Sequence, residues 1–183
     1  MSRRTSETFT IAVVAAIVFA IDQVTKHQIL ASFQIGESRM VIAHLLKLTF
    51  EQNTHGAFGL FGGNTALLIA LAVAVLVVFW LSFRDSAHKS LVVRIAFGMI
   101  VGGAIGNIID RLRYGHVVDF VHVSWFPGIF NMADSAITVG VLMLAGYLLL
   151  MGESGAGTTR QRPGDEALLG ELLGQDQWRG DRR

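Results

Sequence analysis

The chain contains no cysteine, and few of its 183 residues are charged. The absence of cysteine excludes disulfide bonds, thiolate zinc sites and cysteine nucleophiles. Charged residues make up 16% of the sequence, against about 25% in an ordinary soluble domain. The net charge is only +1, so the chain lacks the basic field of a nucleic-acid-binding protein, and we expect no nucleic acid as a partner.

Apolar residues, in contrast, make up 52% of the sequence and lie mostly in long runs. A helix needs roughly 20 residues to cross about 30 Å of hydrocarbon. The first run, 9–21, is too short alone, so we expect its helix to continue through Asp22 and Lys26 to about Phe33. A cleaved signal peptide is the alternative for this segment, but no small-residue cleavage site follows it. The predicted spans are 9–33, 65–83, 91–109 and 133–150.

The fold class that these spans predict is an all-α membrane protein with four transmembrane helices, in one domain at residues 1–152. Two polar connections, 34–63 and 111–132, join the spans on one side. Residues 47–51 alternate polar and apolar, which is typical of a strand with one solvated face, so we predict a small β-sheet element lying on the bilayer. We expect the polar tail at 153–183 to be flexible, with a short surface helix as the alternative for 167–173.

The distribution of Lys and Arg predicts the orientation. Four spans put both termini on the same side, and cytoplasmic segments are enriched in basic residues. The N-terminus, the connection 84–94 and the tail together hold ten of the fifteen Lys and Arg residues. We therefore expect both termini in the cytoplasm, with the connections 34–63 and 111–132 on the outer side of the membrane.

Two aspartates are the first candidates for catalysis. Asp119 follows the turn at Gly115, and Asp134 begins the last span. If the connection between them folds back, the two carboxylates meet at the membrane surface, share a proton, activate water and protonate a leaving amine. In the alternative interpretation, Asp134 only caps the last helix and Asp119 pairs with Arg111 or Arg113.

A second group of polar residues has two interpretations as well. Adjacent residues on a helix do not face each other, so Asp110 and Arg111 must find partners elsewhere. With Asn107, they either tie the third helix to the connections or orient the two aspartates. On the first helix, Asp22 and Lys26 are one turn apart and form either part of the site or a simple pair whose lysine extends outward.

Other catalytic patterns find little support in the sequence. Asn53 either binds the substrate backbone or closes its turn. The six histidines are scattered without an H-E-x-x-H motif, so no metal site or other cofactor is predicted. Ser135 has no lysine or histidine beside it in sequence, so a serine enzyme would require tertiary contacts.

Between Phe9 and Leu150 the sequence resembles the lipoprotein signal peptidases, also called signal peptidase II, a family of bacterial inner-membrane aspartic proteases. Five ordered motifs carry the resemblance: Asp22-Gln23-x-x-Lys26, the turn from Asn53 to Ala57-Phe58-Gly59, Gly102-Gly103-Ala104-x-Gly106-Asn107-x-x-Asp110-Arg111, Gly115-x-Val117-Val118-Asp119-Phe120, and Phe130-Asn131-x-Ala133-Asp134-Ser135.

The resemblance implies that Asp119 and Asp134 are the catalytic pair. It also implies that the site is shaped and supported by Asp22, Lys26, Asn53, Asn107, Asp110, Arg111 and Asn131. The implied substrate is a diacylglyceryl-modified prolipoprotein, cut on the N-terminal side of its lipidated cysteine. The family has four transmembrane helices and a small periplasmic sheet, needs no metal, and is inhibited by the cyclic peptide globomycin. We expect the protein to contact membrane lipids and to be a monomer.

This chain departs from the family at one position. His55 stands where the family usually has glycine, and Gly56 follows it, so a shift of the backbone by one residue puts the place of Asn53 in question.

Two other classes of function are the alternatives to the peptidase. One is a small ion-coupled membrane carrier that relays protons through acids near the bilayer midplane, and the other is an assembly protein without catalysis.

Overall fold

The structure is a computed structural model that describes residues 3–56, 64–87 and 90–155. The chain divides into two compact units, Met1–Tyr147 and Leu148–Arg183. Of the second unit, only the helical residues 148–155 are described. The predicted flexible tail therefore lies outside the described residues beyond position 155, as does the predicted turn beyond Gly56. The site and the core described below belong to the first unit.

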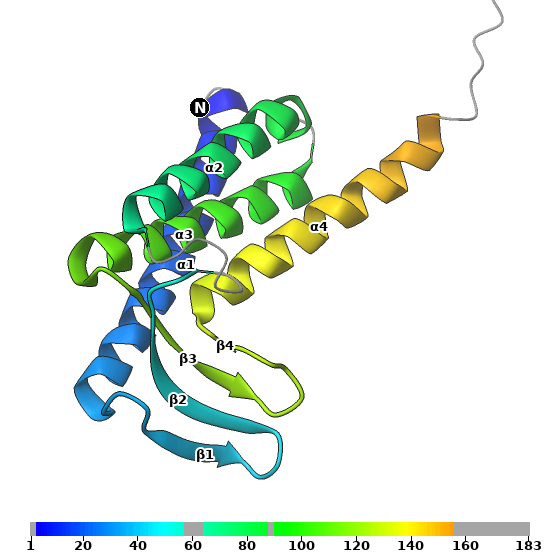
Figure 1. The fold of residues 1–183 in the computed structure, drawn as a ribbon. Helices are drawn as coiled ribbons and strands as arrows, with labels where there is room; N and C mark the ends of the chain where they lie inside the picture. Colours follow the sequence, from blue (N-terminus) through cyan, green and yellow to red (C-terminus); the bar gives the residue numbers. More distant parts are fainter. Residues whose placement is uncertain (1–2, 57–63, 88–89, 156–183) are drawn as a thin grey trace, which may run out of the picture. The chain divides into compact units, whose positions relative to one another are not determined.

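Four helices are long and apolar enough to cross a membrane, as predicted from the sequence (Figure 1). They are α1 (Arg3–Ser32), α2 (Thr65–Ala87), α3 (Leu91–Tyr114) and α4 (Met132–Gly155). The second and third predicted spans end too early, because polar residues such as Arg84 and Arg111 continue each helix beyond its apolar run, to Ala87 and Tyr114. Helix α3 ends at Tyr114 and is capped by Gly115, whose φ of 76° is in the left-handed region that favours glycine.

Helix α3 is the central helix, with 56% of its most apolar stretch buried, a far larger share than in the other helices. Its glycines let neighbouring backbones approach closely, as the small-residue spacing predicts. A Cβ atom at Gly102 would lie 2.5 Å from the carbonyl oxygen of Ala15 in α1. At Gly103 it would lie 2.6 Å from the carbonyl oxygen of Ala133 in α4. Helices α1 and α4 therefore pack directly on the backbone of α3.

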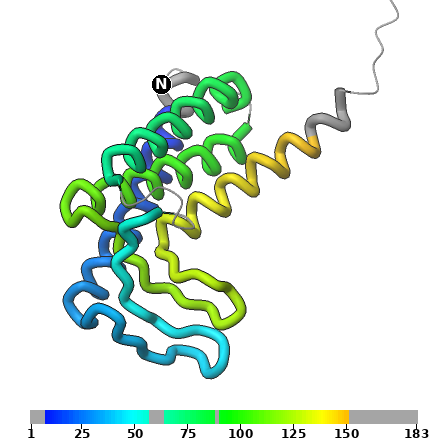
Figure 2. The backbone as a smooth tube through the Cα atoms, in the orientation of Figure 1, coloured from blue at the N-terminus to red at the C-terminus, as the bar shows by residue number. Residues whose placement is uncertain are grey.

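The polar connections form one antiparallel sheet with the strand order β1-β2-β3-β4 (Figure 2). The strands are β1 (Ser38–Ile42), β2 (Leu46–Asn53), β3 (Val117–Val123) and β4 (Ile129–Phe130). The predicted strand at 47–51 is confirmed as part of β2. Polar and apolar residues do not alternate in the sequence of β3. Residues 117–120 are buried in succession, and a strand that is buried on both faces needs no polar side.

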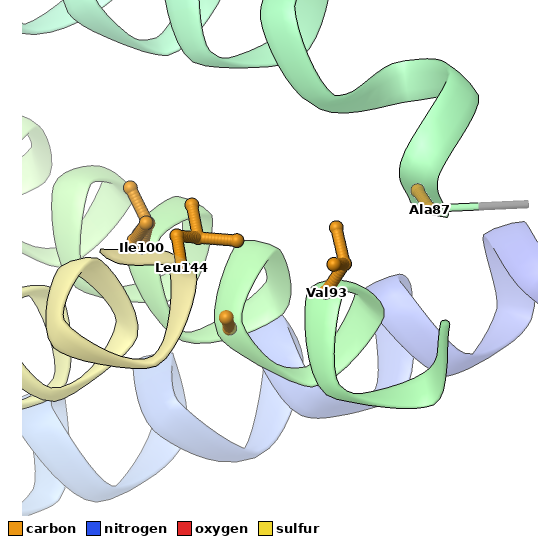
Figure 3. Packing of buried hydrophobic residues seen from close by; sticks show 5 residues of the cluster. Ala87, Val93, Ile100 and Leu144 are labelled. Carbon is orange, nitrogen blue, oxygen red and sulfur yellow. The ribbon is translucent and has the colours of Figure 1, made fainter. Parts of the chain in front are cut away.

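Two apolar clusters hold the first unit together. One joins α2, α3 and α4 through Ala87, Val93, Ala96, Ile100 and Leu144 (Figure 3). The other packs the end of α1 against the sheet through Ile29, Phe50, Val118 and Phe120. The sheet is thereby fixed at one end of the helices. Strand β3 leads away from the end of α3, and β4 leads back to the start of α4 (Figure 1).

Candidate active site

Asn131 joins the two predicted catalytic aspartates. Its amide Nδ2 donates a hydrogen bond of 2.6 Å to Oδ1 of Asp119, and its backbone N–H donates one of 3.3 Å to Oδ2 of Asp134. Asn131 itself is fully buried. The connection between the two aspartates therefore folds back as the turn at residues 127–128 predicts, and one asparagine touches both carboxylates.

Asp119 lies on β3 and is 1% exposed. Its second oxygen, Oδ2, accepts a hydrogen bond of 2.8 Å from the amide of Asn53 on the neighbouring strand. Burial away from water raises the pKa of the Asp119 carboxyl from 3.8 to about 7, and the negative charge of Asp134 acts in the same direction. The amide hydrogen bonds and the charge of Lys26 oppose that increase. The side chain is therefore able to hold a proton near neutral pH.

Asp134 lies in the first turn of α4 and takes part in its cap. The Asn131 amide oxygen accepts the backbone N–H of Asp134 at 2.9 Å, and Asp134 accepts the backbone N–H of Asn131 in return. This reciprocal pair is a capping box, with Asn131 at the N-cap position. The other oxygen, Oδ1, accepts a hydrogen bond of 2.8 Å from the amide of Asn107. The alternative in which Asp134 itself is the cap residue is wrong, because Asn131 occupies that position.

A buried lysine lies behind the pair. The Lys26 ammonium forms ion pairs of 2.8 Å with Asp22 and 2.8 Å with Asp110, and it donates a hydrogen bond of 3.0 Å to Asn107. Lys26 is 2% exposed, so the alternative in which it extends outward to the interface is wrong. An unpaired charge would be very costly at this depth, and here one cation is shared by two carboxylates.

The two buried carboxylates also hold backbone groups. Asp22 accepts a hydrogen bond of 3.0 Å from the N–H of Ala133 in α4. Asp110 accepts one of 3.2 Å from the N–H of Val118 in β3. Asp110 therefore links α3 to both α1 and β3, which agrees with the prediction that its partners lie elsewhere in the chain.

Arg111 lies on α3 and not in the connection that the sequence predicts. Its guanidinium donates a hydrogen bond of 3.3 Å to the backbone oxygen of Asn107 and interacts electrostatically with Asp119 and Asp134. Among the described residues, no salt bridge joins Asp119 to either nearby arginine, so that alternative is wrong. The guanidinium of Arg113 instead donates to Gln23, at 3.4 Å.

Gln23 is the one residue of this network that the prediction missed. Its amide donates to Asp110 at 3.1 Å and to Asp22 at 3.2 Å. The sequence does point to Gln23, because this residue belongs to the motif Asp22-Gln23-x-x-Lys26. In sequence, a glutamine next to an aspartate looks like a residue that only contacts solvent, whereas Gln23 is half-buried.

The turn that follows Asn53 shows how the backbone accommodates His55. Gly56 has a φ of 73°, so the left-handed residue of this turn is one position later than His55. The backbone N–H of Gly56 donates a hydrogen bond of 2.9 Å to the Asn53 side-chain oxygen. Asn53 thus closes its turn, which is one of its two interpretations, and contacts Asp119 with the same amide. That it binds the substrate backbone stays a prediction.

Seven side chains from α1, α3, β2 and the N-cap position of α4 therefore surround the two aspartates. In the part of the chain that is described, no three His, Cys, Asp or Glu residues are grouped to hold a metal ion. The Ser135 hydroxyl donates to the backbone oxygen of Asn131 at 3.0 Å. The arrangement offers two adjacent carboxyls, one able to keep a proton near neutral pH, and this chemistry suits attack by water on a carbonyl group.

Comparison with known proteins gives one consistent result. The family model described as signal peptidase (SPase) II matches residues 14–150. The chain is 40% identical over 142 residues to the lipoprotein signal peptidase of Moorella thermoacetica, covering 77% of this chain and 94% of that one. It is 35% identical over 139 residues to the lipoprotein signal peptidase of Staphylococcus aureus strain RF122 / ET3-1, covering 74% and 85%.

Solved structures agree with these relatives. A structure described as a bacterial membrane enzyme solved by the in meso method at 2.3 Å resolution matches with a TM-score of 0.73 and 31% identity. The match covers 84% of this chain and 94% of that one. The same four-helix arrangement with a sheet at one end therefore occurs in a membrane enzyme related in sequence.

Proposed function

This chain belongs to the signal peptidase II family, and on that premise we propose which of its residues carry out the reaction. The chain is a multi-pass membrane protein and a peptidase that removes signal peptides from prolipoproteins. We propose that Asp119 and Asp134 are its catalytic pair. One observation carries this proposal: buried Asn131 donates a hydrogen bond to each of the two carboxylates.

The proposed mechanism assigns one role to each carboxyl. Asp119 holds the shared proton, which is consistent with its pKa of about 7, and donates it to the scissile carbonyl oxygen. Ionised Asp134 takes a proton from the water that attacks the carbonyl carbon. The tetrahedral intermediate then collapses: Asp134 passes its proton to the leaving nitrogen, and Asp119 recovers one from the hydroxyl group. One water is consumed, and no covalent enzyme intermediate is formed.

The remaining residues position this pair. Asn53 and Asn131 orient Asp119, and Asn107 and Asn131 orient Asp134. Behind them, Lys26 neutralises Asp22 and Asp110, whose carboxylates hold β3 and α4 in place. We propose that Arg111 supplies positive charge beside the pair as charge develops during the reaction.

The finer features of substrate and assembly are also proposals. We propose that the bond cut lies on the N-terminal side of a diacylglyceryl-modified cysteine, that the enzyme acts as a monomer and that globomycin-type cyclic peptides inhibit it. Many large apolar side chains of the helices are exposed on the protein surface, for example Ile17, Val78 and Leu142, and this supports contact with membrane lipids.

We propose a location in the bacterial inner membrane, with both termini cytoplasmic and the aspartates on the outer, periplasmic side. The ten basic residues of the N-terminus, the 84–94 connection and the tail support this orientation. We divide the chain into a peptidase domain at 1–152 and a cytoplasmic tail at 153–183. The carrier alternative has no support from the relatives, and Asp134 lies at the start of a span and not near its middle.

The decisive experiment uses purified protein in detergent with a diacylated lipobox peptide. Asp119→Asn and Asp134→Asn should each lower kcat by about 100- to 10,000-fold, because each removes one partner of an acid–base pair. Asp85→Asn is the control: it makes the same change at an exposed residue near the C-terminal end of α2, and it should leave kcat unchanged. A folded Asp119→Asn or Asp134→Asn variant with normal activity would rule out that residue as catalytic.

A further inference from the structure

Glu51 lies directly opposite Asp119 on the neighbouring strand of the sheet. Opposed residues of an antiparallel pair present their side chains on the same face, with Cβ atoms about 4.5–5.5 Å apart. Asn53 is two residues further along β2 and so shares this face, and its amide reaches Asp119 at 2.8 Å. A third acidic side chain therefore stands on the same face of the sheet as Asp119.

A β-bulge puts Glu51 in this place. Leu48 pairs with Val121, so a regular ladder would pair Phe50 with Asp119. The register shifts between Leu48 and Glu51, and the shift turns Phe50 into the apolar cluster and Glu51 onto the face of Asp119. Bulges of this kind are frequent next to active sites, where they change the direction of a side chain.

Glu51 differs from the other acidic residues around the site because it is exposed. Asp22 and Asp110 are buried and share the Lys26 ammonium. Glu37, before β1, pairs with Arg39 at 2.8 Å. Within the described ranges, Glu51 has no side-chain hydrogen bond and no ion pair. Its charge is therefore available to a molecule that binds beside Asp119.

We propose that Glu51 determines a charge preference for the substrate residue that flanks the scissile bond. A cationic side chain there is favoured, and an acidic one is disfavoured. This inference rests on the proposed function, because it requires the scissile bond to lie at Asp119. Two unit charges about 5–6 Å apart in water interact strongly enough to change kcat/KM about three- to five-fold for each unit of substrate charge.

The test compares three diacylated lipobox peptides that differ only in having Lys, Gln or Glu at one position. The position is the residue before or the residue after the lipidated cysteine, in two separate series. The readout is the ratio of kcat/KM for the Lys peptide to that for the Glu peptide. A general loss of activity or of folded protein cancels in this ratio. For the wild type at low salt, the ratio should be about 10 or more in one of the two series.

Two variants locate the effect. In Glu51→Gln the ratio should fall towards one. The double variant Glu51→Gln/Gln52→Glu keeps the net charge and moves the carboxylate to the other face of β2, since adjacent residues point to opposite faces. Its ratio should also be close to one. A ratio near one for the wild type in both series, or an unchanged ratio in Glu51→Gln, would overturn the inference.

Failure of this inference is distinguishable from failure of the proposed function. If Asp119→Asn still cleaves the Gln peptide, the catalytic assignment fails, and with it the basis for the position of Glu51. If Asp119→Asn is inactive but the ratio does not respond to Glu51→Gln, only the charge preference is wrong.

Discussion

Asp110 accepts a hydrogen bond from the backbone N–H of Val118, the residue immediately before Asp119. The same relationship occurs at the start of α4, where Asp22 holds the N–H of Ala133, the residue before the other catalytic candidate. Each buried carboxylate thus fixes the backbone that carries one member of the pair. The Lys26 ammonium holds the two buried carboxylates together, so a residue on α1 positions groups on β3 and α4.

Replacing Lys26 with methionine should therefore destabilise the protein strongly. The substitution keeps a similar side-chain volume but leaves Asp22 and Asp110 buried without their cation. Removing one partner of a buried ion pair costs about 3–5 kcal/mol. Thermal unfolding in detergent should show a large decrease in Tm for Lys26→Met and little change for Lys47→Met, which makes the same change at a lysine without an ion pair in the described structure. Equal Tm values for the two variants would contradict this role of Lys26.

Replacing Asn131 with serine separates its two functions. Serine is also a good N-cap, so the cap of α4 should survive. The amide donor to Asp119 is lost, however, and misplacing a reacting group by about 1 Å can cost roughly 100-fold in rate. We expect kcat/KM to fall by that amount for Asn131→Ser, with only a small change in Tm. A variant whose Tm falls sharply while the remaining folded enzyme keeps full activity would show that Asn131 is structural alone.

Gly106 should not tolerate a side chain. A Cβ atom at this position would collide with the Asp22 carboxylate, which is held by both Lys26 and the backbone of Ala133. Gly106→Ala should therefore lower both Tm and kcat. Gly146→Ala is the matched control in α4, because a Cβ atom there meets nothing within 4 Å. That variant should be stabilised by about 0.5–1 kcal/mol, since alanine favours helix more than glycine does. If both variants unfold at the wild-type temperature, the close approach at Gly106 has no energetic importance.

Much of this architecture can be predicted because the bilayer simplifies the problem. An apolar run of spanning length can hardly be anything but a transmembrane helix, and the Gly102 and Gly106 spacing indicates where helices touch. The strand β3 could not be predicted in this way. Its first residues, Val117–Phe120, are buried on both faces, so neither the alternation nor the length of the segment separates a strand from a turn of helix.

The candidate site, too, can be predicted from the sequence only in part. Motifs identify the polar residues, but spacing does not reveal their partners. Lys26 looks like an interfacial residue in sequence, and only the packing of α1 on α3 shows that it is buried between Asp22 and Asp110. The position of Glu51 opposite Asp119 depends on a bulge, which is a feature of the strand pairing and not of either strand alone.

The pH dependence follows from the pKa of Asp119. Burial and the charge of Asp134 raise this pKa from 3.8 to about 7, so the folded protein keeps the proton over a range in which the unfolded chain has released it. The folded state then binds more protons than the unfolded state between these two values. The contribution of this group to the free energy of unfolding therefore falls as the pH rises from about 4 to about 7, and it changes little above that.

The activity should respond at the upper end of the same range. If Asp119 donates a proton to the scissile carbonyl, kcat/KM should fall about tenfold for each pH unit above about 7, because the required protonated form becomes scarce. The measurement is kcat/KM from pH 5 to 9 with an uncharged lipobox peptide, together with Tm at each pH to exclude unfolding. The substrate must be uncharged, because the charge of Glu51 would otherwise add its own effect on binding. A rate that stays constant up to pH 9 in folded enzyme would show that Asp119 is not the proton donor, and the roles of the two aspartates would then have to be exchanged.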